Sequence, residues 1–146
     1  MKYRILWFDK DENIRKVFED ILKDEGFLVD STGNGREALA MICEAVNINK
    51  PYDLVIAHVF SNREKTYDPN FIDGEWLIEE MIKRGIYPKI PVIITLSLKG
   101  RGLADKVEDY YFARYKVAGL VTRPINSEKL FQKIATVLLI KECGLV

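Results

Sequence analysis

The feature that most constrains the fold is a series of short apolar runs that alternate with helical patterns. Each run is too short to form a helix, and the runs cover residues 5–8, 27–29, 54–57, 92–95 and 120–122. Between and after them, apolar residues recur every three or four positions, the spacing of an amphipathic helix. Strands that are apolar throughout and alternate with helices predict a parallel sheet covered on both faces. The predicted fold class is therefore α/β, a doubly wound, five-stranded parallel sheet of flavodoxin-like order 2-1-3-4-5 in a (βα)5 three-layer sandwich.

The size and charge of the chain predict a single domain and exclude several functions. We expect one domain over residues 1–141 and a short tail over 142–146, with no DNA-binding domain after it. The 22 basic and 22 acidic residues balance, which argues against a general binder of nucleic acid or of anionic membranes. No apolar run approaches the ~18 residues of a membrane span, and the first residues lack the features of a signal peptide. Cys43 and Cys143 lie far apart, as suits a reducing compartment, so we expect a cytoplasmic protein.

The candidate site follows from the predicted sheet. Ligands of such sheets bind at the carboxyl ends of the strands, where the strand order reverses. In this chain that edge comprises residues 9–11, 58–60, 95–97 and 122–124. These positions carry carboxylates, cations, hydroxyls and the one histidine of the chain.

Five segments, taken in order, resemble the receiver domain of two-component response regulators. They are ILWFDKDENIRKVFEDILKDEGF, PYDLVIAHV, IDGEWLIEEM, IPVIITLS and GLVTRPINSEKL, and they cover almost the whole chain. The resemblance implies a CheY-like fold and a phosphorylation pocket at the carboxyl edge. Such a pocket has an acidic pair after the first strand and a phosphorylatable Asp after the third. It also has Thr or Ser ending the fourth strand, an aromatic residue in the fifth, and a Lys just before a proline.

The sequence departs from that pattern at most of these positions. Asp9 matches the first acidic residue, but Lys10 occupies the second, and His58 stands in the place of the phosphoacceptor. Leu96 aligns with the Thr or Ser, Leu120 replaces the aromatic residue, and Arg123 replaces the Lys. We therefore interpret the pocket as a degenerate one with no catalytic residue, a pseudo-receiver pocket formed by Asp9, Lys10, Asp11, His58, Thr95, Leu96, Ser97, Arg123 and Pro124. Because Thr95 and Ser97 flank Leu96, a shift of one residue restores a hydroxyl at that position.

These departures alter the chemistry of the pocket. Without a carboxylate at position 58, no acyl phosphate can form there. Lys10 places a cation beside the position that Mg²⁺ would occupy, and at ~4 Å and an effective dielectric of about 20 one such charge–charge interaction is of order 4 kcal/mol. We expect a pocket that is independent of metal and cofactor, with Lys10 paired to Asp9 or Asp11. The resemblance also implies a cis peptide bond between Arg123 and Pro124.

Two side chains of this pocket admit more than one interpretation. His58 is a neutral side chain that fills the pocket and bonds a neighbour, or a transition-metal ligand together with Asp9 and Asp11, or a phosphorylated imidazole. Arg123 is an ion-pair partner of Asp9 or Asp11, or a receptor for a bound anion.

Two further regions are candidates for partner binding. The stretch from Val59 to Ile72 is long for a loop of this fold and is either a tolerated surface insertion, or a lid or partner-docking loop over the pocket. Apolar residues in the last two helical patterns exceed what one narrow core-facing stripe needs, which indicates either an interface or, at least as well for the final helix, a broad core-facing stripe. The resemblance implies the same surface, formed by helix 4, strand 5 and helix 5, with Tyr110, Tyr111, Leu120 and Phe131 as its candidate residues.

The leading functional hypothesis is an atypical, stand-alone receiver-like signalling module that works through protein contacts without aspartyl phosphorylation. Its partner is a signalling protein or an output domain, and a homodimer is a further option. The alternative is a phosphatase-like or phosphotransferase-like enzyme, or a metal-binding switch, that uses Asp9, Asp11 and His58. For the enzyme, Asp9 and Asp11 resemble the Asp-x-Asp opening of haloacid-dehalogenase-type phosphatases.

Overall fold

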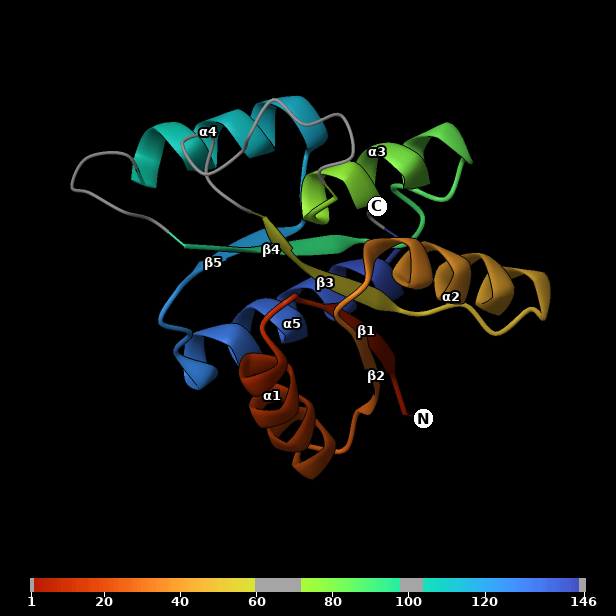
Figure 1. Cartoon of the computed structure of the whole chain (residues 1–146), viewed down its shortest axis with the longest axis horizontal. Coiled ribbons are helices and arrows are strands. Elements are labelled where there is room, and N and C mark those ends of the chain that lie inside the picture. Colours follow the sequence, from red (N-terminus) through yellow and green to blue (C-terminus); the bar gives the residue numbers. More distant parts are fainter. Residues whose placement is uncertain (1, 60–71, 98–103, 145–146) are drawn as a thin grey trace.

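The computed structural model describes residues 2–59, 72–97 and 104–144 and has the predicted architecture (Figure 1). Its strands form one parallel sheet in the order β2-β1-β3-β4-β5, so the fold class predicted from the sequence is confirmed. The strands are β1 (Arg4–Phe8), β2 (Leu28–Thr32), β3 (Leu54–Val59), β4 (Val92–Leu96) and β5 (Gly119–Thr122). The helices are α1 (Glu12–Asp24), α2 (Gly35–Asn47), α3 (Gly74–Lys83), α4 (Ala104–Tyr115) and α5 (Ser127–Glu142).

Local sequence signals account for where the helices begin and end. Asp11 caps α1, because its side chain accepts hydrogen bonds from the backbone N–H groups of residues 13 and 14. Gly26, just beyond the helix, has a φ of +95°, a conformation that glycine adopts without steric cost. Within the described residues, no helix combines the length and apolar character needed to cross a bilayer.

Strand β2 is longer than the sequence predicts. The apolar run that predicts this strand ends at residue 29, but β2 continues to Thr32 because it pairs with β1 along its whole length, up to Phe8. Strand β4 likewise extends one residue further than predicted, to Leu96, which pairs with Val59 and with Thr122. Tertiary pairing therefore sets these strand ends.

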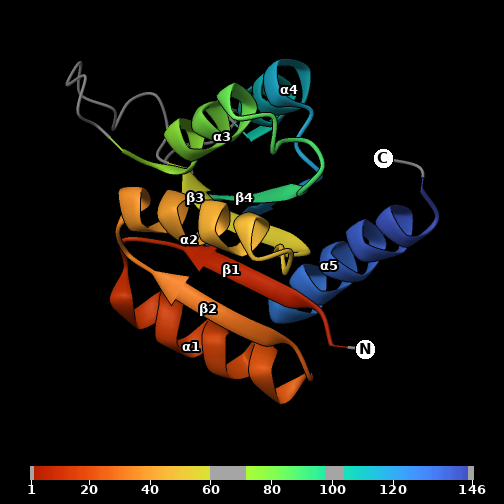
Figure 2. The ribbon, with the colours of Figure 1, turned by 90° about the vertical axis from the view of Figure 1, so that its right-hand side faces the viewer.

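Helices cover both faces of the sheet (Figure 2). Alternate residues of β1, β3, β4 and β5 supply two separate cores. Helices α2, α3 and α4 cover one face, against Leu6, Val55 and Ile94 among others. Helices α1 and α5 cover the other face, against Trp7, Ile56 and Ile93 among others. Trp7 also stacks on Phe18 of α1, with ring centroids 5.3 Å apart. Because the side-chain period of a strand is two, the sequence parity of a residue decides which face it serves.

Helix α3 begins in close contact with the end of β3. A Cβ atom at Gly74 would lie 2.8 Å from the carbonyl oxygen of His58 and 2.9 Å from Cγ2 of Val59. Asp73, the N-cap of α3, is buried and accepts hydrogen bonds from the N–H groups of residues 75 and 76. The absence of a side chain at Gly74 is what lets α3 approach the carboxyl end of β3.

We predict that Gly74→Ala lowers the free energy of unfolding by about 1–3 kcal/mol, because the added methyl group overpacks this contact. The matched control is Gly119→Ala, where the nearest atom to the added Cβ would be 3.5 Å away, and we expect a change within about 0.5 kcal/mol. Urea denaturation followed by circular dichroism measures both. Equal losses in the two variants would contradict the close contact at Gly74.

Candidate functional site

Four polar side chains lie near the carboxyl edge on the α1/α5 side of the sheet. Asp9 continues the alternate positions 5 and 7 of β1, whose side chains face α1 and α5. His58 likewise continues the alternate positions 54 and 56 of β3. In the same way, Thr95 follows Ile93 and Arg123 follows Val121. The sheet therefore brings together four residues that the sequence predicts at this site: Asp9, His58, Thr95 and Arg123.

Asp9 is 1% exposed, and both of its carboxylate oxygens have a partner. Oδ1 accepts a hydrogen bond of 2.9 Å from the backbone N–H of Asp11. Oδ2 forms an ion pair with Nη2 of Arg123. The predicted role of Arg123 as an ion-pair partner of Asp9 is confirmed. The buried Asp9 carboxylate therefore has a structural role, since both of its oxygens bind groups within the protein.

Arg123 carries its charge into a largely buried position, its side chain being 14% exposed. Burial lowers the pKa of its guanidinium to about 10, so the group remains protonated at neutral pH. Its Nε atom is buried and has no hydrogen-bond partner among the residues that the structure describes. The peptide bond between Arg123 and Pro124 is cis, as the resemblance implies.

His58 is buried and bonds to the neighbouring strand. Its Nδ1 lies 3.1 Å from Oγ1 of Thr95, the residue paired with it in the sheet, and both side chains are almost fully buried. Leu96, which aligns with the family's Thr or Ser, instead lies in the core beneath α3 and α4. Of the two hydroxyl residues that flank Leu96, Thr95 is the one that contacts His58.

The remaining acidic residues of this edge cap helices. Asp11 is exposed and caps α1, while the buried Asp73 caps α3. Lys10 and Pro124 are exposed, and Ser97 is half-buried. In the part of the chain that the structure describes, no three His, Cys, Asp or Glu side chains gather as metal ligands would. The interpretation of His58 as a metal ligand with Asp9 and Asp11 therefore lacks the cluster it requires.

Sequence reasoning missed one residue of this site, Arg15. Its Nη1 donates a 2.7 Å hydrogen bond to the backbone carbonyl of Asp9. The guanidinium fits because Gly33 has no side chain: a Cβ atom there would lie 2.4 Å from Nη1 of Arg15. The only available signal was a basic residue in the first turn of a helix that follows the site, which is too common to select it.

A second feature that the sequence did not predict is a polar network that joins α3 to α4. Oη of Tyr115 lies 2.7 Å from Oε1 of both Glu75 and Glu79, and it accepts a hydrogen bond of 2.9 Å from Nε of Arg114. Tyr111 also donates to Glu75, at 3.4 Å. A detectable signal was present, because the two glutamates and the two tyrosines are each spaced four apart and so lie on one helical face. The network attaches the C-terminal half of α4 to α3.

This packing corrects the predicted interface. Tyr111 is 1% exposed and Leu120 is 6% exposed, and both belong to the core between the sheet and α2, α3 and α4. They are therefore wrong as contact residues, because each fills space under a helix. Phe131 is half-buried against the other core, whereas Tyr110 is 38% exposed. The predicted lid from Val59 to Ile72 falls mostly on residues 60–71, which lie outside the described residues.

We predict that Arg123→Met lowers the free energy of unfolding by about 3–5 kcal/mol, because it leaves the Asp9 carboxylate buried without its ionic partner. Urea denaturation at pH 7 measures the loss. The Asp9→Asn/Arg123→Met double variant removes both charges, so it should lose less than the sum of the two single variants. Additive losses would show that the two charges do not interact.

A second prediction concerns alkaline pH. Burial and the nearby glutamates raise the pKa of Tyr111 and Tyr115 above the ordinary value of 10.0. The folded state therefore holds these protons more tightly than the unfolded state, so their stabilising contribution is complete below pH 10 and is lost as the pH rises above it. We expect the urea midpoint to fall from pH 8 to pH 11, and to fall less in Tyr115→Phe. An equal fall in both proteins would contradict this assignment.

Comparison with known proteins agrees with this architecture, although no family model matches the sequence. The chain is 30% identical over 135 residues, 92% of its length, to the "Probable transcriptional regulator ycf29" of Porphyra purpurea. It is 31% identical over 126 residues, 86% of its length, to an NtrX-like response regulator of Rickettsia typhi. It covers 56% of the first relative and 23% of the second, so it spans only part of the curated proteins it matches.

Solved structures show the same fold. A CheY-like response regulator receiver domain from Methanospirillum hungatei JF-1 superposes with a TM-score of 0.73 at 23% identity, over 99% of both chains. The chain therefore has the CheY-like receiver fold, and over most of its own length it is similar in sequence to response regulators.

Proposed function

We propose that this chain is a receiver-like signalling module that acts through protein–protein contacts, without aspartyl phosphorylation and without catalysis of its own. One observation carries the proposal: at the carboxyl edge the Asp9 carboxylate is bound on both oxygens, while His58 takes the position at the end of β3 and bonds to Thr95. In this proposal, the Asp9 carboxylate is engaged in internal contacts, and a histidine replaces the carboxylate that would accept the phosphoryl group.

The chemistry of phosphoryl transfer explains why this arrangement opposes phosphorylation. The acceptor must be a carboxylate, and a divalent cation must bridge acidic oxygens to the phosphoryl group. A histidine at position 58 cannot form an acyl phosphate. An Asp9 neutralised by the Arg123 guanidinium offers a divalent cation little attraction, because the guanidinium would repel that cation at short range. We therefore propose a pocket that works without metal or other cofactor.

The attachment of α4 supports a module with one conformation. Tyr115 and Tyr111 bond to glutamates of α3, and Tyr111 is buried beneath α4. A helix held by several hydrogen bonds to its neighbour moves only if those bonds break together. We propose that the surface formed by α4 keeps one conformation and is always accessible to a partner.

The partner in this proposal is a signalling protein or an output domain, as the regulators related to this chain suggest. We retain a homodimer through the α4–β5–α5 face as a further proposal, with Tyr110 as its exposed candidate residue. Balanced charge argues against nucleic acid and membranes as partners, and we propose a cytoplasmic location.

The test is a titration with Mg²⁺ and then with beryllofluoride, a mimic of the phosphoryl group, followed by backbone amide NMR. We expect no saturable shift at the amides of Asp9, His58 and Thr95, because the carboxylates that would bind these reagents are absent or already bound. Saturable shifts there that spread to α4 and α5 would refute the proposal.

The matched control is the triple variant Lys10→Asp/His58→Asp/Arg123→Lys, which restores the expected acids and lysine. It should respond to the same reagents, with shifts at residues 9 and 58, if these three departures silence the site. A phosphorylatable receiver domain titrated in parallel verifies that the reagents are active. A response in the wild-type chain equal to that in the triple variant would show that the departures have no effect.

A further inference from the structure

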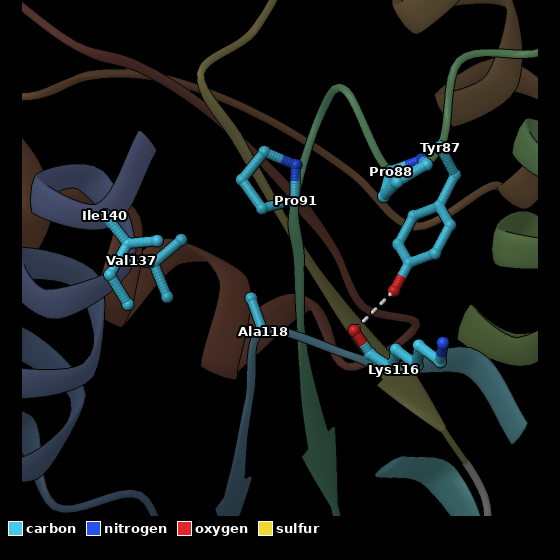
Figure 3. Close-up of a pocket in the computed structure, with 7 residues that line it drawn as sticks. All are labelled: Tyr87, Pro88, Pro91, Lys116, Ala118, Val137 and Ile140. Carbon is cyan, nitrogen blue, oxygen red and sulfur yellow. Dashed lines mark hydrogen bonds between the residues drawn. The ribbon is translucent and has the colours of Figure 1, made fainter. Parts of the chain in front are cut away.

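A small apolar hollow lies at the amino end of the sheet, at the opposite edge from His58 (Figure 3). It occupies about 170 Å³ where the segments that lead into β4 and β5 meet the last turns of α5. Seven residues line it: Tyr87, Pro88, Pro91, Lys116, Ala118, Val137 and Ile140. None of them belongs to the degenerate pocket.

The walls of this hollow are held in place. The hydroxyl of Tyr87 hydrogen bonds to the carbonyl oxygens of Tyr115 and Lys116, the latter at 2.9 Å (Figure 3). Burial raises the pKa of Tyr87 to about 12, so its hydroxyl remains a donor at neutral pH. Pro88 and Pro91 restrict the backbone on one side. The hollow is thus formed before any ligand arrives, which reduces the entropy lost on binding.

The volume of the hollow limits what it can accept. An apolar cavity of about 150 Å³ is large enough to hold a benzene ring. A hollow of about 170 Å³ therefore has room for one leucine, isoleucine or phenylalanine side chain. Ile140, 37% exposed, offers apolar surface at its mouth.

The charges around the hollow favour an acidic occupant. Lys116 is exposed at its rim, and Lys133 lines an adjoining hollow that shares Ala118 and Val137 with it. No aspartate or glutamate is among the described residues that line either hollow. The hollow on the other side of α5 is different, because Glu25 and Glu142 line it. A lysine thus lines each of the two hollows on this side of α5, whereas glutamates line the hollow on its other side.

We propose that this hollow binds one apolar side chain of an acidic peptide segment of a protein partner. The inference rests on the proposed function, since it assigns a place to the partner contact. Apolar burial supplies most of the affinity, and the two lysines select carboxylates beside the buried side chain. A single side chain buries little area, so the contact is weak unless other contacts of the partner add to it.

The probe is the peptide acetyl-Glu-Asp-Leu-Glu-Asp-amide, titrated into the whole chain and followed by amide and methyl NMR. We expect saturable shifts in the millimolar range at Ala118, Val137 and Ile140. Replacing the leucine of the peptide by serine should abolish them, and replacing its acidic residues by lysine should do the same. Absence of shifts with the acidic leucine peptide, or equal shifts with the lysine peptide, would overturn the proposal.

Variants of the chain provide the matched controls. Ile140→Asp should weaken binding about tenfold or more, because it introduces a like charge at the mouth of the hollow. Leu139→Asp, on the neighbouring and more exposed position that faces the other hollow, should leave binding unchanged. Lys116→Gln should weaken binding about two- to fivefold, as expected for an exposed ion pair. Equal effects of the two aspartate variants would overturn the assignment to this hollow.

Two further outcomes are informative. Shifts at the same residues when the chain alone is diluted would assign the hollow to a second copy of the chain and overturn the peptide proposal. The beryllofluoride titration reports on the opposite edge of the sheet. If the peptide causes no shifts and beryllofluoride causes none either, the proposed peptide site is wrong and the proposed function stands. If beryllofluoride causes saturable shifts, the proposed function is wrong.

Discussion

The buried ion pair between Asp9 and Arg123 determines what the carboxyl edge of the sheet can do. The two residues follow β1 and β5, and the strand order places β3 and β4 between them. A carboxylate as buried as Asp9 costs several kcal/mol to desolvate, so its cationic partner must stay beside it. The end of the last strand is thereby tied to the end of the first. His58 and Thr95, on the two intervening strands, form a second polar contact at the same edge.

The two ends of the sheet differ in their physical character. At the carboxyl end, charges are paired inside the protein, and a ligand would have to displace an ion pair to bind Asp9. At the amino end, the hollow beside α5 is apolar and has an exposed lysine at its rim. Binding there displaces water from an apolar surface. A partner therefore meets less resistance at the amino end, although the fold places ligands of related sheets at the carboxyl end.

The sequence predicted the strand order and most of the site because those features depend on local patterns. Short apolar runs and their alternation with helices determine a parallel sheet, and a parallel sheet brings residues 9, 58, 95 and 123 to one edge. The predictions that failed depend on which way a side chain faces. Tyr111 was expected at an interface but is buried. The prediction failed because the three consecutive aromatic residues 110–112 show an excess of apolar surface without showing which of them faces the core. The sequence shows the four-residue spacing of the glutamates and of the tyrosines, but the network around Glu75 also depends on the distance between α3 and α4, which no local pattern contains.

Under the proposed function, the input to this module is the binding of the partner itself. Phosphorylation can shift a receiver between two conformations because it adds charge and new hydrogen bonds to one of them. A ligand that is to move such an equilibrium from 1:99 to 99:1 must favour one conformation by about 5.5 kcal/mol. In this proposal, the chain has no covalent source for that energy at its carboxyl edge, where Arg123 holds Asp9. Signalling by such a chain depends on how much of it is present and on how tightly its partner binds.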